Sequence, residues 1–153
     1  MNHKQRLLIL SCSQRKRIAQ ASLPAIERYN GPLFFVLRRF LRECPHQAEQ
    51  LEVCILSAAY GLIPGDFPTA LYDQKMDASR VVELQQQINI TFRDILQNNY
   101  ASICFVLGKA YMKGFESLLD LIPSSMETII TRGTIGRRQA QLKNWLWEKS
   151  LDN

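Results

Sequence analysis

A short segment after the first apolar run combines hydroxyls, a thiol and cations, the side chains that bind anions. It contains Ser11, Cys12, Ser13, Arg15, Lys16 and Arg17. Hydroxyls, backbone N–H groups and an ammonium can together surround a phosphate or a carboxylate. Cys12 is also a candidate nucleophile, although neither His of the chain is placed by sequence to activate it. The segment lacks the glycines of a Walker A loop, and a polar turn with solvated charges is the alternative interpretation.

A second segment, residues 57–76, is rich in aromatic residues and shows no helix or strand pattern. Such long loops are commonly functional. Ser57 and Gly61 open the segment, and Tyr60 or Tyr72 could stack on a base. Asp73 is a candidate catalytic carboxylate that could orient a water molecule. The alternative is structural: the rings close the edge of the core, and Asp73 caps a turn.

Glycines and arginines follow two further apolar runs. Gly108 and Tyr111 come after the third run, and a glycine there lets a ligand approach the backbone. The fourth run is followed by Arg132, Gly133, Gly136, Arg137 and Arg138. The planar fork of arginine matches phosphate oxygens, so we expect Gly133 and Arg137 at a ligand. A flexible basic turn is the alternative.

The elements that must position these residues are four short apolar runs. They span residues 7–10, 51–56, 103–107 and 128–131. Near-continuous apolarity is typical of strands that are covered on both faces. Alternation with helical patterns predicts an α/β fold, a three-layer sandwich with a mostly parallel sheet of about four strands and helices on both faces. Ligands of such sheets bind beyond the carboxyl ends of the strands, where all these segments should meet.

Four amphipathic stretches predict the helices. The first begins at Pro32 and carries Arg38, Arg39 and Arg42 opposite its apolar face. Asp77 is expected to cap the second, whose apolar stripe runs from residue 81 to 95. The third stripe covers residues 112–119, and the fourth lies around residues 142–146.

Length and composition fit one domain over residues 1–153, with a formal net charge of +5. The basic excess lies in residues 1–17 and 132–153. If the fold joins these ends, they form a nucleic-acid-binding surface, for which the candidates are Arg15, Arg17, Arg132, Arg138 and Lys143; scattered surface charge is the alternative. No apolar run approaches the roughly 20 residues that span a bilayer, so we expect no membrane partner and a cytoplasmic protein. Two isolated His and four Cys without a CxxC pair predict no metal, no disulfide framework and no cofactor.

Several motifs resemble an uncharacterised domain family of bacteria and phages, whose pattern is SCSxxK, LSAxYGL and YDxxM. The matching segments are residues 8–16, 29–34, 55–62 and 72–76, including Tyr29 and Met76, with Gly108, Tyr111 and the turn at residues 133–136 as later landmarks. The family is distantly similar to the peroxide-stress protein YaaA and to a central domain of archaeosine synthase, which resemble the uracil-DNA-glycosylase-like fold. The resemblance implies a base or nucleotide ligand. The helix-hairpin-helix insertion of the YaaA branch is missing here, which puts a DNA-protecting role in doubt.

Three functions remain open at this point. The first is a domain that handles a nucleobase, nucleotide or nucleic acid and acts at an N-glycosidic bond, with Lys16 and Arg137 on phosphate. The second is a non-catalytic nucleic-acid-binding module, and the third is a small-ligand sensor that works through a partner protein. The reaction, the substrate and the oligomeric state do not follow from the sequence.

Overall fold

Four parallel strands form the centre of the molecule, as predicted. The structure, a computed structural model, describes residues 4–19 and 21–148, so the outermost parts of the two basic ends lie outside the described residues. The strands are β1 (Arg6–Ser11), β3 (Leu51–Ser57), β6 (Ser102–Val106) and β7 (Glu127–Ile130), in the order β3-β1-β6-β7. The side chains of β1, β3 and β6 are mostly buried because layers of helices cover both faces, whereas those of β7, at the edge of the sheet, are exposed or half-buried.

A fifth strand corrects the prediction that residues 57–76 lack regular structure. β4 (Gly61–Pro64) pairs antiparallel with β3 at the edge of the sheet, and β5 (Pro68–Thr69) pairs with β2 (Leu23–Pro24) in a separate ribbon. Gly61 makes the tight turn into β4 with a φ of 81°. Strands of two to four residues are too short to show alternation in sequence.

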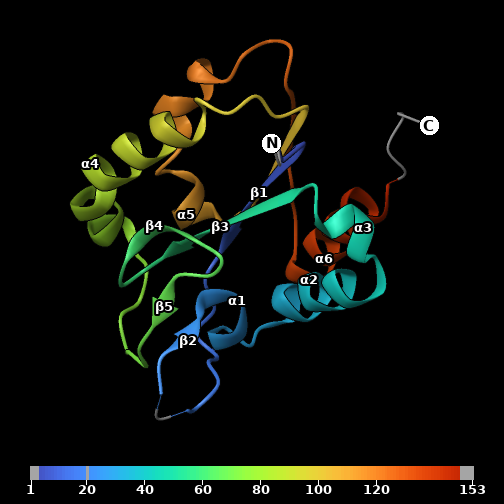
Figure 1. Cartoon of the computed structure of the whole chain (residues 1–153). Helices are drawn as coiled ribbons and strands as arrows, with labels where there is room; N and C mark the ends of the chain where they lie inside the picture. The colour runs from blue at the N-terminus through green and yellow to red at the C-terminus, as the bar shows by residue number, and fades with distance from the viewer. Residues whose placement is uncertain (1–3, 20, 149–153) are drawn as a thin grey trace.

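The helices lie in two layers, one on each side of the sheet (Figure 1). On one side are α2 (Pro32–Glu43) and α6 (Ile135–Trp147). The short helices α1 (Ala25–Arg28) and α3 (Pro45–Ala48) come just before and just after α2 in the chain. On the other side is α4 (Ala78–Ile95). Alternate residues of β1 belong to two cores: Leu8 and Leu10 lie in the core with α2 and α6, and Leu7 and Ile9 lie in the core with α4. The three-layer α/β sandwich is therefore confirmed.

The helix predictions hold for α2, α4 and α6 and are wrong for the third stripe. The carboxylate of Asp77 accepts the backbone N–H of Arg80 and caps α4, as expected. Residues 112–119 do not form one helix. They are divided between α5 (Lys109–Met112) and a 3₁₀ helix, η1 (Glu116–Leu121). Of the predicted stripe, Phe115 is buried and Met112 and Leu119 are half-buried, so the apolar spacing indicated the inward-facing side but not the break in the helix.

Arg38 was expected on the solvent face of α2, and the structure buries it. Its guanidinium donates to the carbonyl oxygens of Ile26 and Tyr29 and to the side-chain oxygen of Asn30. Desolvation by this burial lowers the pKa of Arg38. Arg38 thus holds the turn that leads into α2.

Among the described residues, no helix is long and apolar enough to cross a membrane.

Candidate functional site

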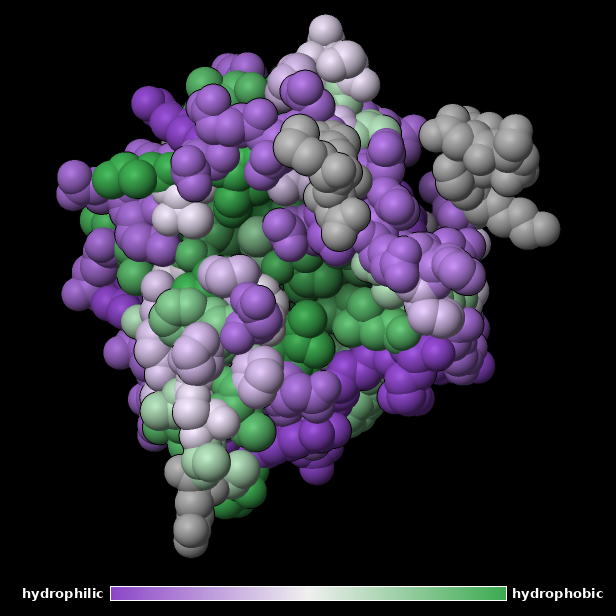
Figure 2. Space-filling view, in the orientation of Figure 1, coloured by the Kyte–Doolittle hydropathy of each residue, from purple (hydrophilic) through white to green (hydrophobic). Residues whose placement is uncertain are grey.

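The carboxyl ends of the four parallel strands bring the predicted segments to one edge of the sheet. Ser11 at the end of β1 is in register with Leu56 of β3, and Leu10 is in register with Val106 of β6. The residues that follow, from Cys12, Ser57 and Gly108 onward, therefore start side by side. In the space-filling view, hydrophobic residues lie recessed in the middle of the molecule and hydrophilic residues surround them (Figure 2).

Three hydroxyls from distant parts of the chain meet at this edge. The Tyr29 hydroxyl donates to Ser57 Oγ at 2.9 Å, and the Tyr72 hydroxyl lies 2.8 Å from that of Tyr29 and 3.1 Å from Ser57 Oγ. Ser57 Oγ also accepts the backbone N–H groups of Ala59 and Tyr60, each at 3.2 Å. Either hydroxyl can donate in the contact between Ser57 and Tyr72, and Tyr72 is the only one of the three that is not fully buried. We call Tyr29, Ser57 and Tyr72 the hydroxyl cluster.

Burial keeps the phenols of this region neutral. Desolvation raises the pKa of Tyr29 to about 12, although hydrogen bonds from Ser57 and Tyr72 oppose the shift. Desolvation also raises the pKa values of Tyr72 and of Tyr111 well above their ordinary value, and charge on the nearby Cys12 acts in the same direction. The cluster can therefore donate and accept hydrogen bonds at neutral pH but does not supply a phenolate.

Lys16 lies on the ring of Tyr72, which changes how the aromatic residues can bind a ligand. The ammonium is 4.4 Å from the ring centroid and also donates to the carbonyl oxygen of Gln14 at 3.2 Å. Tyr60 packs edge-on against Tyr72 and at a tilt against Phe67, and its hydroxyl accepts the backbone N–H of Ala70. One face of Tyr72 is thus occupied by a cation, so polar contacts to its hydroxyl are better supported than base stacking on that face.

Cys12 lies next to the hydroxyl cluster on the side of β6. Its Sγ accepts the backbone N–H of Ala58 at 3.4 Å and lies 3.4 Å from the hydroxyl of Tyr111. The side chain is 8% exposed. The sequence motifs on β1, β3 and α5 therefore meet in one contiguous set of contacts.

An arginine that sequence reasoning missed holds the basic segment in place. Arg28 is fully buried, and its guanidinium reaches four carbonyl oxygens and one hydroxyl. The acceptors are the carbonyls of Arg17, Ala19, Ala21 and Thr69 and the Thr69 hydroxyl. Lys16 also forms a backbone bridge with Tyr29. The position of Lys16 over Tyr72 is therefore built by the fold, and no local sequence signal announces Arg28.

Arg80 has a similar role in the loop after β3. Its guanidinium donates to the carbonyl oxygens of Ala58 and Ala59 at 2.6 and 2.9 Å, and it pairs with Glu83 at 3.7 Å. It thereby fixes the turn whose N–H groups reach Ser57. An arginine three residues after a helix N-cap is common and carries no sequence signal of such a role, so only the structure identifies this contact.

The other predicted residues lie around this centre with fewer contacts. Ser13 Oγ donates to the carbonyl of Arg15, which is exposed, and Arg17 pairs with Glu27 at 3.0 Å. Lys143 is exposed eight residues into α6, about 12 Å along the helix from its start, so it lies away from the edge.

The turn after β7 separates its neighbouring arginines. Arg137 is exposed and packs over Gly133, whose φ is 97°. Arg132 is also exposed, and its backbone is held by the amide of Gln141. Arg138 is half-buried.

Asp73 is exposed at the start of the segment that leads to α4. Within the described part of the chain its carboxylate has no hydrogen bond or ion pair, and the helix cap is Asp77 instead. The turn-capping alternative thus finds no contact in its favour. A catalytic role remains a prediction.

Charge is strongly segregated at this edge. The sequence has no Asp or Glu in residues 1–26, 107–115 and 128–147, which contain the segments after β1, β6 and β7. The charged side chains of these three stretches are therefore all Lys or Arg. The loop after β3 is the exception and contributes Asp66 and Asp73. The edge therefore favours an anionic ligand.

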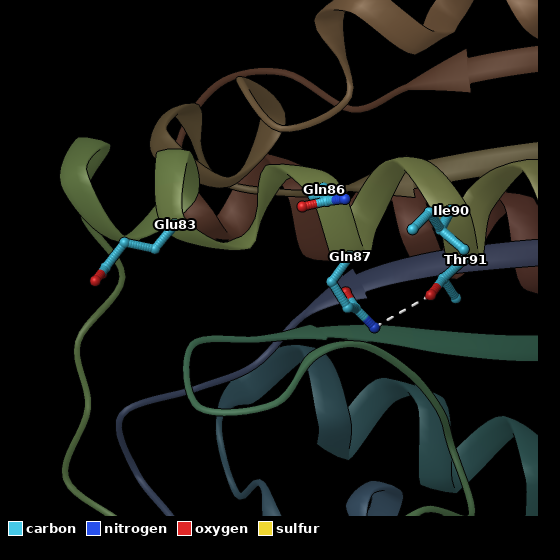
Figure 3. A pocket seen from close by; sticks show the side chains of 5 residues that line it. All are labelled: Glu83, Gln86, Gln87, Ile90 and Thr91. Atoms are coloured by element: carbon cyan, nitrogen blue, oxygen red, sulfur yellow. Dashed lines mark hydrogen bonds between the residues drawn. The ribbon is translucent and has the colours of Figure 1, made fainter.

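Possible metal ligands and a groove on α4 were the other candidates for a site. Among residues 4–19 and 21–148, no three His, Cys, Asp or Glu side chains are grouped to hold a metal ion, and the four cysteines are free. A groove of about 390 Å³ runs along α4 and is lined by Glu83, Gln86, Gln87, Ile90 and Thr91 (Figure 3). Gln87 there caps the edge strand β4, bonding both the N–H and the carbonyl of Leu62. The groove contains none of the predicted site residues and no cation.

Comparison with known proteins gives a family and a fold. The model of a family of unknown function (DUF6884) matches residues 7–144. The search of curated proteins found no match. The crystal structure of AF0587, a protein of unknown function, is similar with a TM-score of 0.58 and 15% sequence identity, covering 96% of this chain and 46% of that chain. The chain thus spans less than half of AF0587, and the likeness concerns the fold alone.

Proposed function

Since the chain belongs to DUF6884, a family of unknown function, we propose its function from the site: the domain binds a nucleobase-bearing anion, a nucleotide or a nucleic-acid end, at the carboxyl edge of the sheet. The observation that carries this proposal is the hydroxyl cluster beneath Lys16, at an edge whose other three segments have no carboxylate. Neutral hydroxyls suit the donors and acceptors of a base, and the cations suit its phosphate. The distant similarity of the family that these motifs resemble to YaaA and archaeosine synthase is consistent with the same ligand class, and we propose that the protein acts in the cytoplasm.

Binding is tested with a matched series of ligands. Bases, nucleosides, nucleoside monophosphates and short single-stranded oligonucleotides are compared by thermal shift and calorimetry. We expect monophosphates to bind more tightly than nucleosides, and Lys16→Met to weaken binding by about tenfold, the effect of one charge-assisted contact. Arg93→Met, an exposed cation in the last turn of α4, is the control and should bind as the wild type does. Equal affinity of the wild type and Lys16→Met would contradict the proposal.

The reaction we propose for this site is hydrolysis of an N-glycosidic bond. Asp73 would accept a proton from water as the water oxygen bonds to the sugar C1′ and the bond from C1′ to the base nitrogen breaks. The Asp73 carboxylic acid would then give this proton to the leaving base, directly or through water, which restores the carboxylate. The support is the exposed carboxylate of Asp73, which follows Tyr72 in the chain and has no hydrogen bond or ion pair with any residue that the structure describes. Cys12 is the alternative nucleophile, in contact with Ala58 N and Tyr111.

Release of free base, followed by chromatography, tests the reaction. Asp73→Asn should retain binding and lose turnover, whereas Cys12→Ser should retain both if Asp73 is the catalytic group. Binding without any base release by the wild type would refute the hydrolase and favour a small-ligand sensor.

A second candidate function is non-catalytic nucleic-acid binding, because Arg15, Arg132 and Arg137 are exposed without ion pairs in the described part of the chain. Oligonucleotide affinity should then fall steeply with salt, since bound phosphates release counterions. Arg132→Ala with Arg137→Ala should weaken all sequences alike. No oligonucleotide binding at low salt would exclude this candidate.

A further inference from the structure

Arg138 lies beside the end of β6, on the other side of Cys12 from Lys16. Its Nη1 is 3.8 Å from the position that a Cβ of Gly108 would take, and the ring of Tyr111 is 3.6 Å from the same point. Tyr111 in turn contacts Cys12. The bare backbone of Gly108 thus lets the guanidinium approach the edge where the predicted site residues gather.

The guanidinium of Arg138 lacks the partners that a partly buried cation requires. Its Nε is buried and has no hydrogen-bond acceptor among the described residues. No ion pair is formed by this side chain in the described part of the chain, and the segments after β6 and β7 contain no carboxylate. A partly desolvated guanidinium that the fold leaves without an acceptor is costly, and an external anion that contacts its Nη atoms beside Gly108 would supply a partner for its charge.

We propose that Arg138 binds an anionic oxygen group, a phosphate, of the ligand. The proposal rests on the proposed function and adds an orientation to it. Lys16 and the hydroxyl cluster lie on the side of β3, Arg138 and Tyr111 lie on the side of β6, and Cys12 of β1 lies between them. Two strand spacings, about 10 Å, separate these sides. A nucleoside monophosphate is long enough to place its base near Tyr72 and its phosphate at Arg138. In this orientation Lys16 contacts the carbonyl oxygens of the base, and Arg138 replaces Lys16 and Arg137 as the contact of the phosphate.

Arg137 provides a matched control. It is the adjacent residue with the same charge, but its side chain is exposed and packs over Gly133. A general effect of positive charge would make the two arginines equivalent. If the fold positions Arg138 to bind phosphate, only the substitution of Arg138 should reduce the preference for phosphorylated ligands.

The test compares AMP with adenosine and UMP with uridine by calorimetry, for the wild type, Arg138→Gln and Arg137→Gln. We expect the wild type to prefer the phosphorylated ligand by about tenfold or more, Arg138→Gln to lose this preference, and Arg137→Gln to keep it. Circular dichroism confirms that each variant is folded, and Arg138→Lys, which keeps the charge without the fork, should recover part of the preference. A preference that survives in Arg138→Gln, or is lost equally in Arg137→Gln, overturns the proposal.

A second measurement separates this inference from the proposed function. Inorganic phosphate is titrated while the Arg138 Nε–H and Gly108 amide signals are followed by NMR. Shifts of these two signals without binding of any nucleoside or nucleotide support the phosphate site and refute the nucleotide function. If phosphate leaves both signals unchanged, Arg138 does not bind an anion and the inference is wrong.

Discussion

Replacing Ser57 by alanine should destabilise the protein clearly, because its hydroxyl serves more donors than any neighbouring group. The Oγ accepts the N–H groups of Ala59 and Tyr60 at 3.2 Å and the hydroxyl of Tyr29 at 2.9 Å, and Ser57 is fully buried. In Ser57→Ala the Tyr29 hydroxyl can still bond to Tyr72, 2.8 Å away. Two backbone donors then remain without acceptors, at about 1–1.5 kcal/mol each, so we expect a loss of about 2–3 kcal/mol.

Thermal and urea unfolding, followed by circular dichroism, measure this loss. For a chain of this size, about 2–4 °C of Tm corresponds to each kcal/mol, so Ser57→Ala should melt about 4–12 °C below the wild type. Ser13→Ala is the control: Ser13 Oγ donates only to the carbonyl of Arg15, and the change should stay within about 0.5 kcal/mol. If Ser57→Ala is as stable as Ser13→Ala, the hydroxyl cluster does not organise this edge.

Three further predictions concern the groups that surround the site. Burial raises the pKa of Tyr29 to about 12, so the unfolded phenol ionises first and Tyr29 contributes a loss of stability as the pH rises from about 10 to 12. Other buried phenols and thiols with raised pKa values add to this loss, so the Tyr29 share, about 2 kcal/mol at pH 12, is measured as the difference in pH dependence between the wild type and Tyr29→Phe in urea unfolding. Arg28→Met should make trypsin cleave at residues 15–17 about thirtyfold faster, since the loss of about 2 kcal/mol of charge-assisted hydrogen bonds raises the population in which this segment is open. An unchanged cleavage rate would mean that Arg28 does not hold the segment in place. Gly61→Ala should cost about 3 kcal/mol of unfolding free energy, because φ is 81° and the new Cβ would lie 2.3 Å from Gln87 Oε1; a stable Gly61→Ala would mean that Gln87 does not hold β4.

The fold was largely predictable because its central strands are continuous apolar runs. The runs at residues 7–10, 51–56, 103–107 and 128–131 became four parallel strands. The rule for ligand sites in parallel sheets then brought Lys16, Cys12 and Tyr72 to one edge before any contact was known. The β4 strand and the β2–β5 ribbon were missed because two to four residues carry no periodic signal.

The supporting arginines could not be predicted for a different reason. Arg28, Arg38 and Arg80 donate to backbone carbonyls supplied by distant turns, for example Arg28 to Thr69, 41 residues away. An arginine in sequence is expected at the surface, and its burial depends on acceptors that only the tertiary fold brings together. The same holds for Arg137 and Arg138, which are equivalent in sequence and differ in exposure because α6 turns only one of them toward Gly108.

The most direct test of nucleotide binding at the carboxyl edge is amide chemical-shift mapping by NMR during titration with AMP and UMP. The account predicts that the largest shifts occur in residues 11–17, 57–61 and 108–111, at the ends of β1, β3 and β6, while the groove of α4 around Gln86 and Ile90 stays unchanged. Shifts confined to that groove, or no shifts with either nucleotide, would contradict it.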